Sequence, residues 1–141
     1  MEKINFDSGV RAYKLGSGVL RFNPADPNLY ARFMEAAEKI KALEEELSVQ
    51  GREASGESAL TLLQSADQKM KQTLNWVFGE EADFDRLLGG VNLLAMGSNG
   101  ERVATNLFTA LEPVLVAGAK SCAAGQVQAA VARAKTRRAK Q

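Results

Sequence analysis

The chain has 141 residues, 45% of them hydrophobic and 25% charged, and its formal net charge is +1. These values are ordinary for one globular domain that buries a core. The sequence has no histidine and a single cysteine, Cys122. This composition excludes a Ser-His or Cys-His pair, an imidazole metal site and an internal disulfide. We therefore predict a protein without enzymatic activity, cofactor or metal, in a reducing cytoplasm.

Charge is unevenly distributed along the chain. Residues 1–112 carry 12 Lys/Arg and 17 Asp/Glu, a net charge of −5, whereas residues 113–141 carry 6 Lys/Arg and no acid, a net charge of +6. Such a division indicates an acidic body with a basic tail. No uninterrupted apolar run approaches the roughly 18 residues typical of a membrane helix. The N-terminus lacks the apolar stretch of a signal peptide, and we expect no membrane association.

Residues 10–22 have the pattern of a β-hairpin. Two β-favouring runs, 10–15 and 19–22, flank the loop Gly16-Ser17-Gly18, and a short glycine-containing loop is typical of such a turn. Alternation places Leu20 and Phe22 on one face of the second strand. An isolated hairpin is marginally stable in water, so we expect it to pack on a helix.

The clearest boundary in the sequence is Asn23-Pro24-Ala25-Asp26-Pro27. Proline ends the strand, Asp26 is a good N-cap, and Pro27 suits the first helical position. A helix is expected from Pro27 to about Leu47. Its apolar residues recur at heptad spacing, which also suits a coiled-coil seam, but a core-facing helix is the favoured interpretation. These residues are Phe33, Ala36, Ile40, Leu43 and Leu47.

A second helix is predicted over residues 57–78, after a polar linker at residues 50–56. The short linker favours an antiparallel helical hairpin, and Gly79 is expected to end the helix. Asp67 is interpreted as a solvated residue at the margin of the apolar stripe. Trp76 and Phe78 are interpreted as core residues, although an exposed tryptophan would indicate a binding surface. The apolar stripe consists of Leu60, Leu63, Ala66, Met70, Leu74 and Val77.

The remaining elements are less regular. Short helices are expected over residues 80–88 and 93–96, followed by a longer helix from Gly100 or Glu101. Pro113 is expected to kink or divide that helix. Residues 119–139 are rich in alanine but poor in large apolar groups, so we expect only local helix there. The acids at residues 80–85 lack the spacing of a calcium loop.

The predicted fold is mainly α (α+β), with an N-terminal β-hairpin followed by a helical bundle or helical hairpins. Residues 1–120 are expected to form a single domain, and residues 121–141 a basic, alanine-rich tail. The candidate partner-binding residues lie in this tail and are chosen by charge position alone. They are Arg133, Lys135, Arg137 and Arg138.

Three interpretations of the basic tail are open: a solvated segment, a contact to an acidic protein or to a neighbouring copy, and a contact to nucleic acid. No aromatic residue follows Phe108, so stacking on bases is unavailable there. The acidic body would also repel phosphates. A protein partner or a homo-oligomer is therefore preferred over nucleic acid.

Several segments resemble one family, the tail assembly chaperones of tailed phages and prophages. They are VLRFNPADPNLYARF at residues 19–33, VFGEE at 77–81, GGVN at 89–92, and NG at 99–100 leading to NLFTALEP at 106–113. The resemblance covers about residues 4–120. It implies a chaperone that binds the tape measure protein during tail morphogenesis and is absent from the mature virion. Such proteins are often also made in a longer, frameshifted form.

Two alternative functions are open at this stage. The first is a structural head–tail or tail component that stays in the phage particle. The second is a nucleic-acid-binding regulator that uses the basic C-terminal tail. The alternatives differ in whether the protein is found in purified particles and whether it binds DNA in a salt-dependent way.

Overall fold

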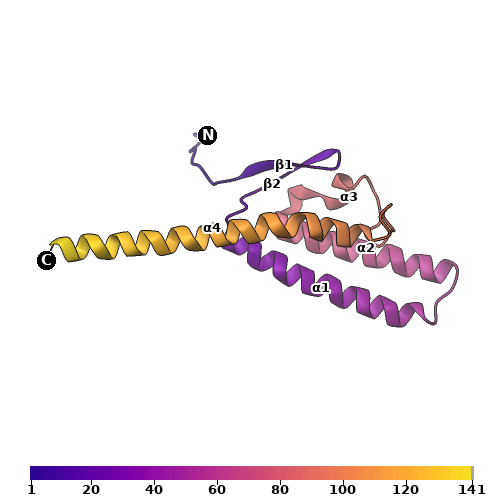
Figure 1. Cartoon of the computed structure of the whole chain (residues 1–141). Coiled ribbons are helices and arrows are strands. Elements are labelled where there is room, and N and C mark those ends of the chain that lie inside the picture. The colour runs from indigo at the N-terminus through magenta and orange to yellow at the C-terminus, as the bar shows by residue number, and fades with distance from the viewer. Residues whose placement is uncertain (141) are drawn as a thin grey trace.

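The computed structural model describes residues 1–140, and the surroundings of all their side chains except those of residues 80 and 138–140. It shows a mainly helical chain with a two-stranded antiparallel hairpin at its N-terminal end (Figure 1). This confirms the predicted fold class. The elements in chain order are β1 (Arg11–Leu15), β2 (Gly18–Phe22), α1 (Pro27–Gly51), α2 (Glu57–Phe78), the 3₁₀ turn η1 (Glu80–Ala82), α3 (Phe84–Leu87) and α4 (Val103–Lys140).

The β-hairpin packs on the helices through one face. Leu20 and Phe22 are buried, whereas Val19 and Arg21, which alternate with them, are exposed, and this confirms the predicted alternation. The ring of Phe22 stacks on Tyr13 of β1 at 4.5 Å between ring centroids. These contacts supply the support that a lone hairpin lacks.

Helix α1 begins where the sequence predicts. The Asp26 side chain accepts a hydrogen bond from the Asn28 amide at 2.9 Å, and Pro27 occupies the first turn. The helix extends to Gly51 rather than to about Leu47, because no helix-breaking residue precedes the turn that follows. Leu29 joins the predicted Phe33, Ala36 and Ile40 in the core, and Leu43 and Leu47 are partly buried.

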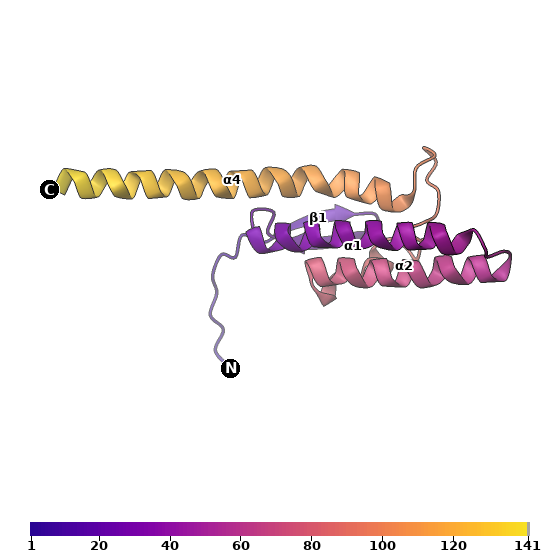
Figure 2. The same ribbon diagram turned by 90° about the horizontal axis from the view of Figure 1, so that it is seen from below.

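Helix α2 has the predicted bounds and runs antiparallel to α1, as Figures 1 and 2 show. Gly79 ends it with φ +105° and donates its amide to the Asn75 carbonyl at 2.7 Å. The predicted stripe is buried from Ala66 onward. Leu60, by contrast, is exposed. Its assignment to the stripe was wrong, because the first turns of α2 lie at the tip of the hairpin, beyond the core.

The segment between α2 and α4 differs from the prediction. Residues 80–88 form η1 and α3 in place of one helix. The helix expected at residues 93–96 is absent, because the Leu93 and Ala95 carbonyls accept hydrogen bonds from the first amides of α4. These are Ala104 to Leu93 at 2.8 Å and Val103 to Ala95 at 2.9 Å. The segment therefore caps α4 from outside instead of coiling on itself.

Helix α4 is continuous from Val103 to Lys140. Pro113 lies on its exposed side and does not divide it. The expectation of only local helix over residues 119–139 was also wrong. The packed first half of α4 provides a nucleus from which alanine-rich sequence propagates at little cost.

Helix α4 crosses the start of α1 at Gly118. A Cβ atom built on this glycine would collide with the Pro24 carbonyl oxygen, so only glycine permits the approach. On the N-terminal side of this crossing, Ala104, Leu107, Leu111 and Leu115 are buried in the core. On its C-terminal side, the last partly buried residue up to residue 137 is Cys122.

Candidate functional site

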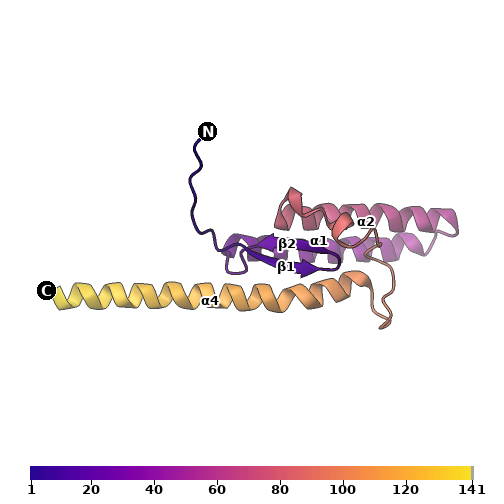
Figure 3. The same ribbon diagram turned by 90° about the horizontal axis from the view of Figure 1, so that it is seen from above.

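The C-terminal part of α4 protrudes from the body as a single helix (Figures 1–3). Every described side chain from residue 123 to residue 137 is exposed. At about 1.5 Å of rise per residue, this segment extends roughly 20 Å. We call residues 123–140 the protruding helix. A helix that buries no side chain offers its whole circumference to a partner.

The candidate residues predicted from charge lie on this protruding helix. Arg133, Lys135 and Arg137 are exposed, whereas the side chain of Arg138 lies outside the described residues. The Arg133 Nε donates to the Ala129 carbonyl, one turn earlier, at 3.4 Å. Successive helical residues are rotated by about 100°. Arg133 and Arg137, one turn apart, therefore lie on one face, whereas Lys135 between them lies on the opposite face. The structure gathers them on one helix but not on one face.

Small and apolar side chains accompany these charges. Val127 and Val131 are spaced by one turn and lie on the same face of the protruding helix, and both are exposed. Seven of the eighteen residues of the protruding helix are alanines. Because alanine side chains are small, they let a partner helix approach the backbone of this helix closely. The arrangement can therefore combine apolar contact with attraction to acidic groups.

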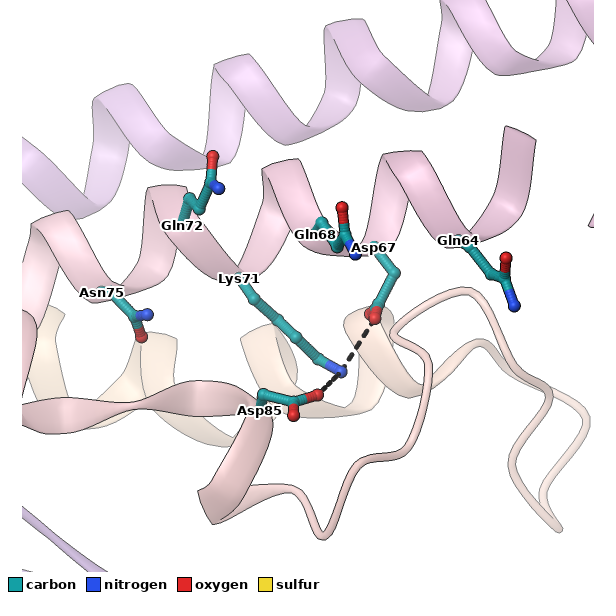
Figure 4. A pocket seen from close by; sticks show the side chains of 7 residues that line it. All are labelled: Gln64, Asp67, Gln68, Lys71, Gln72, Asn75 and Asp85. Atoms are coloured by element: carbon teal, nitrogen blue, oxygen red, sulfur yellow. Dashed lines mark hydrogen bonds and ion pairs between the residues drawn. The ribbon is translucent and has the colours of Figure 1, made fainter. Parts of the chain in front are cut away.

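A second polar feature lies on α2, where Lys71 forms a bridge between two carboxylates (Figure 4). Its ammonium Nζ lies 2.8 Å from Asp67 Oδ2 and 2.7 Å from Asp85 Oδ1, and its side chain is 5% exposed. Burial lowers the pKa of Lys71, but hydrogen bonds and charges from Asp67 and Asp85 outweigh it, so the pKa is raised above its ordinary value. The lysine is held in its charged form.

The bridge fastens the irregular segment to α2. Asp67 Oδ1 also accepts a hydrogen bond from the Leu93 amide at 2.8 Å, and Asp85 belongs to α3. Asp67 is thus a partnered and largely buried residue, and its interpretation as a solvated margin residue was wrong. Sequence periodicity located it near the apolar stripe, but Lys71 one turn away was the signal for its partner.

The bridge lines a cavity of about 540 Å³. A charged ammonium with a raised pKa is a poor nucleophile and a poor general base. Within the described residues, no cluster of three His, Cys, Asp or Glu could hold a metal ion. The cavity is lined by Gln64, Asp67, Gln68, Lys71, Gln72, Asn75 and Asp85.

Trp76 lies on the surface of α2 rather than in the core. Its side chain is 44% exposed, and the Lys39 ammonium lies over its ring at 4.8 Å from the centroid. The interpretation as a core residue was wrong. The helical repeat that aligns Met70, Leu74 and Val77 rotates Trp76 well away from their stripe, so the periodicity carried the correct signal. An exposed tryptophan of this kind is a candidate binding contact.

Length and composition alone would allow the α4 segment Val103–Arg137 to cross a membrane, a criterion that core helices of soluble proteins also meet. The largest apolar side chains of α4 face the core of the body, where Leu107, Leu111 and Leu115 are buried. The exposed remainder consists mainly of alanines and basic residues, which contribute little apolar burial.

No protein-family model, curated protein or solved structure matches the chain.

Proposed function

We propose that the protein is a non-enzymatic chaperone that binds the tape measure protein of a tailed phage in the host cytoplasm during tail morphogenesis. The observation that carries the binding role is the protruding helix, whose described side chains are all exposed from residue 123 to residue 137. The choice of client rests on the resemblance of residues 4–120 to tail assembly chaperones.

The protruding helix has the properties that a helical client requires. Small alanine side chains permit close approach of a second helix, and Val127 and Val131 supply an apolar face. Arg133, Lys135 and Arg137 add positive charge, and no acid follows Glu112 in the sequence. We propose that this helix lies against apolar and acidic faces of an amphipathic client, as in other helix-to-helix recognition.

Two observations outside the protruding helix are compatible with this role. The exposed Trp76 offers a further aromatic contact. The buried Lys71 bridge is a structural fastening of the body rather than a reactive group. A chaperone of this kind needs no cofactor, and the proposal assigns none.

Co-expression tests the proposal directly. The proposal requires a long tape-measure-like reading frame near the gene, which we expect directly downstream. The full chain is produced together with the product of that frame, and the soluble fraction of that product is measured. We expect a clear gain in solubility with the full chain and a loss of that gain when residues 121–141 are removed. An exposed leucine substitution, Leu60→Ser, is a control that should keep the gain. No gain in solubility, or no such reading frame downstream, would contradict the proposal.

Proteomics of purified particles distinguishes the chaperone from a structural component. A chaperone is expected to be absent from mature particles, whereas a head–tail or tail component would be present at a fixed copy number. Detection of the chain in particles at that level would replace the proposed function by the structural one.

A further inference from the structure

The first ten residues form an extended arm that leaves the body without joining any helix or strand (Figures 1 and 3). The arm is rich in uncovered apolar side chains. Ile4 is 88% exposed and Phe6 is 80% exposed, and Met1 and Val10 are also exposed. Exposed apolar groups concentrated on one short segment are typical of an interaction site.

The arm has the pattern of a strand. Glu2, Ile4 and Phe6 alternate with Lys3 and Asn5. In an extended conformation the first three side chains point to one side and the other two to the opposite side. The apolar side of the arm therefore consists of Ile4 and Phe6 with one acid beside them.

The base of the arm is fixed by two hydrogen bonds. The Gly9 amide donates to Asp7 Oδ1 at 2.8 Å, and the Asn23 Nδ2 donates to the Ser8 carbonyl at 3.0 Å. Gly9 has φ +74°, in a region where glycine is favoured. These contacts hold the base of the arm in place, while residues 1–6 before it are exposed.

A groove lies beside the base of the arm, between β1 and α4. Its volume is about 730 Å³. Within residues 1–140, β1 pairs only with β2, so the other edge of β1 carries N–H and C=O groups without a strand partner. The groove is lined by Asp7, Gly9, Val10, Arg11, Tyr13, Asn23, Pro24, Ala25, Val114, Ala117, Gly118 and Ser121.

We propose that residues 1–6 of a second copy of the chain occupy this groove as an added strand along the free edge of β1. Strand addition would satisfy the backbone groups of both segments. Ile4 and Phe6 would contact the apolar α4 wall at Val114 and Ala117. Glu2, on the same side of the arm, would be placed near Arg11 of the groove, where the opposite charges attract.

A second copy of the chain is the occupant that the positions of the arm and the groove indicate. Arm and groove are both uncovered in one chain, and the arm starts at the rim of the groove. A twofold arrangement of two copies therefore lets both arms exchange at once, and each copy covers the apolar side chains of the other. This exchange is independent of the tape measure client and stands if the proposed function fails.

Sedimentation velocity of the full chain at increasing concentration tests the exchange. We expect wild-type protein to self-associate at both 0.15 M and 1 M salt, because apolar burial and backbone pairing are only weakly screened. Phe6→Asp should weaken self-association at least tenfold, as expected for losing a buried aromatic side chain. Asn5→Asp adds the same charge on the opposite side of the arm, and it should change the dissociation constant less than about threefold.

A mixing experiment identifies the two contact surfaces. Phe6→Asp disables the arm but leaves the groove, whereas Ala117→Glu blocks the groove but leaves the arm. Both positions are exposed, so neither change should alter the far-ultraviolet circular dichroism spectrum. Each variant alone is expected to be largely monomeric. Their mixture should form one-to-one heterodimers, because one intact arm meets one intact groove.

Several outcomes would overturn the exchange. A wild-type monomer up to the millimolar range is one, and self-association that persists in Phe6→Asp is another. Association that disappears at 1 M salt would assign the contact to surface charges instead. Amide hydrogen exchange gives a further criterion: protection of residues 1–6 that does not depend on protein concentration would place the arm on its own chain.

Discussion

The α1–α2 hairpin and the protruding helix are both long helices, yet they are maintained in different ways. The hairpin buries one face along most of its length, with Phe33, Met70 and Leu74 among its least exposed residues. The described side chains of the protruding helix bury nothing. Isolated helices are marginal in water even when they are rich in alanine. The comparison locates the stability of the protein in the body and leaves the protruding helix free to bind.

Shortening a side chain should lower the free energy of unfolding far more in the core than in the protruding helix, and this is the largest difference that we expect between the two regions. Leu74 is fully buried in α2, and Leu74→Ala is expected to lower the free energy of unfolding by about 2–5 kcal/mol. Val131→Ala shortens an exposed β-branched residue on the protruding helix, and its effect should stay within about 0.5 kcal/mol. Urea denaturation followed by circular dichroism measures both. Equal losses would show that the protruding helix also has a packed partner within the chain.

Two glycines of α4 offer a second comparison. Gly118 contacts the Pro24 carbonyl, whereas a Cβ atom on Gly125 would have no neighbour within 4 Å. Gly118→Ala should destabilise the protein by about 1–3 kcal/mol, because α4 has to shift from the body. Gly125→Ala should instead favour helix locally by up to about 1 kcal/mol.

Denaturation measures the Gly118→Ala effect, and amide hydrogen exchange of residues 123–137 measures the Gly125→Ala effect. Slower exchange in the second variant is expected without a change in global stability. If Gly118→Ala left stability unchanged, the close crossing of α4 over the start of α1 would be refuted.

Local signals in the sequence were sufficient for much of the body. Asp26 and Pro27 define the start of α1, Gly79 the end of α2, and the alternation around Leu20 the buried face of the hairpin. Each depends on capping, backbone freedom or periodicity within a few residues. The fold class follows from these elements together.

Long-range contacts were not predictable in the same way. The carbonyls of Leu93 and Ala95 accept hydrogen bonds from the first turn of α4. No local sequence pattern indicates that residues 93–96 will form these bonds instead of a short helix. Asp67 similarly binds Lys71 and the distant Leu93 amide. The basic residues of the candidate site were found by charge, but their presentation on a protruding helix depended on helix propagation from the packed half of α4.

The Lys71 bridge should make an intermediate contribution to the free energy of unfolding, and this contribution should depend on pH. Lys71→Met keeps the apolar stem but leaves Asp67 without its ammonium partner, at a cost of about 1–2 kcal/mol. Because the folded-state pKa of Lys71 is raised above the ordinary 10.5, its contribution is fully present below that pH and is lost as pH rises through the folded-state pKa.

The difference in unfolding free energy between wild type and Lys71→Met should therefore be constant near neutral pH and shrink in strongly alkaline solution. Lys69→Met is the matched control, since Lys69 lies exposed on the same helix and its loss should cost less than about 0.5 kcal/mol. Equal effects of the two substitutions would mean that the bridge adds nothing to the fastening of α3.

Removal of residues 121–141 should have the smallest effect on stability. Among the described residues, the last buried one in α4 is Leu115, which the body retains. The free energy of unfolding from urea denaturation should therefore change by less than about 0.5 kcal/mol. The removed segment contains no acid, so the net charge of the remainder falls by 5. The five basic residues lost are Arg133, Lys135, Arg137, Arg138 and Lys140. An unchanged midpoint combined with loss of client solubility would separate folding from binding, which is the division that the two regions imply. A large loss of stability would instead make the protruding helix part of the folded core and remove the basis for its proposed role.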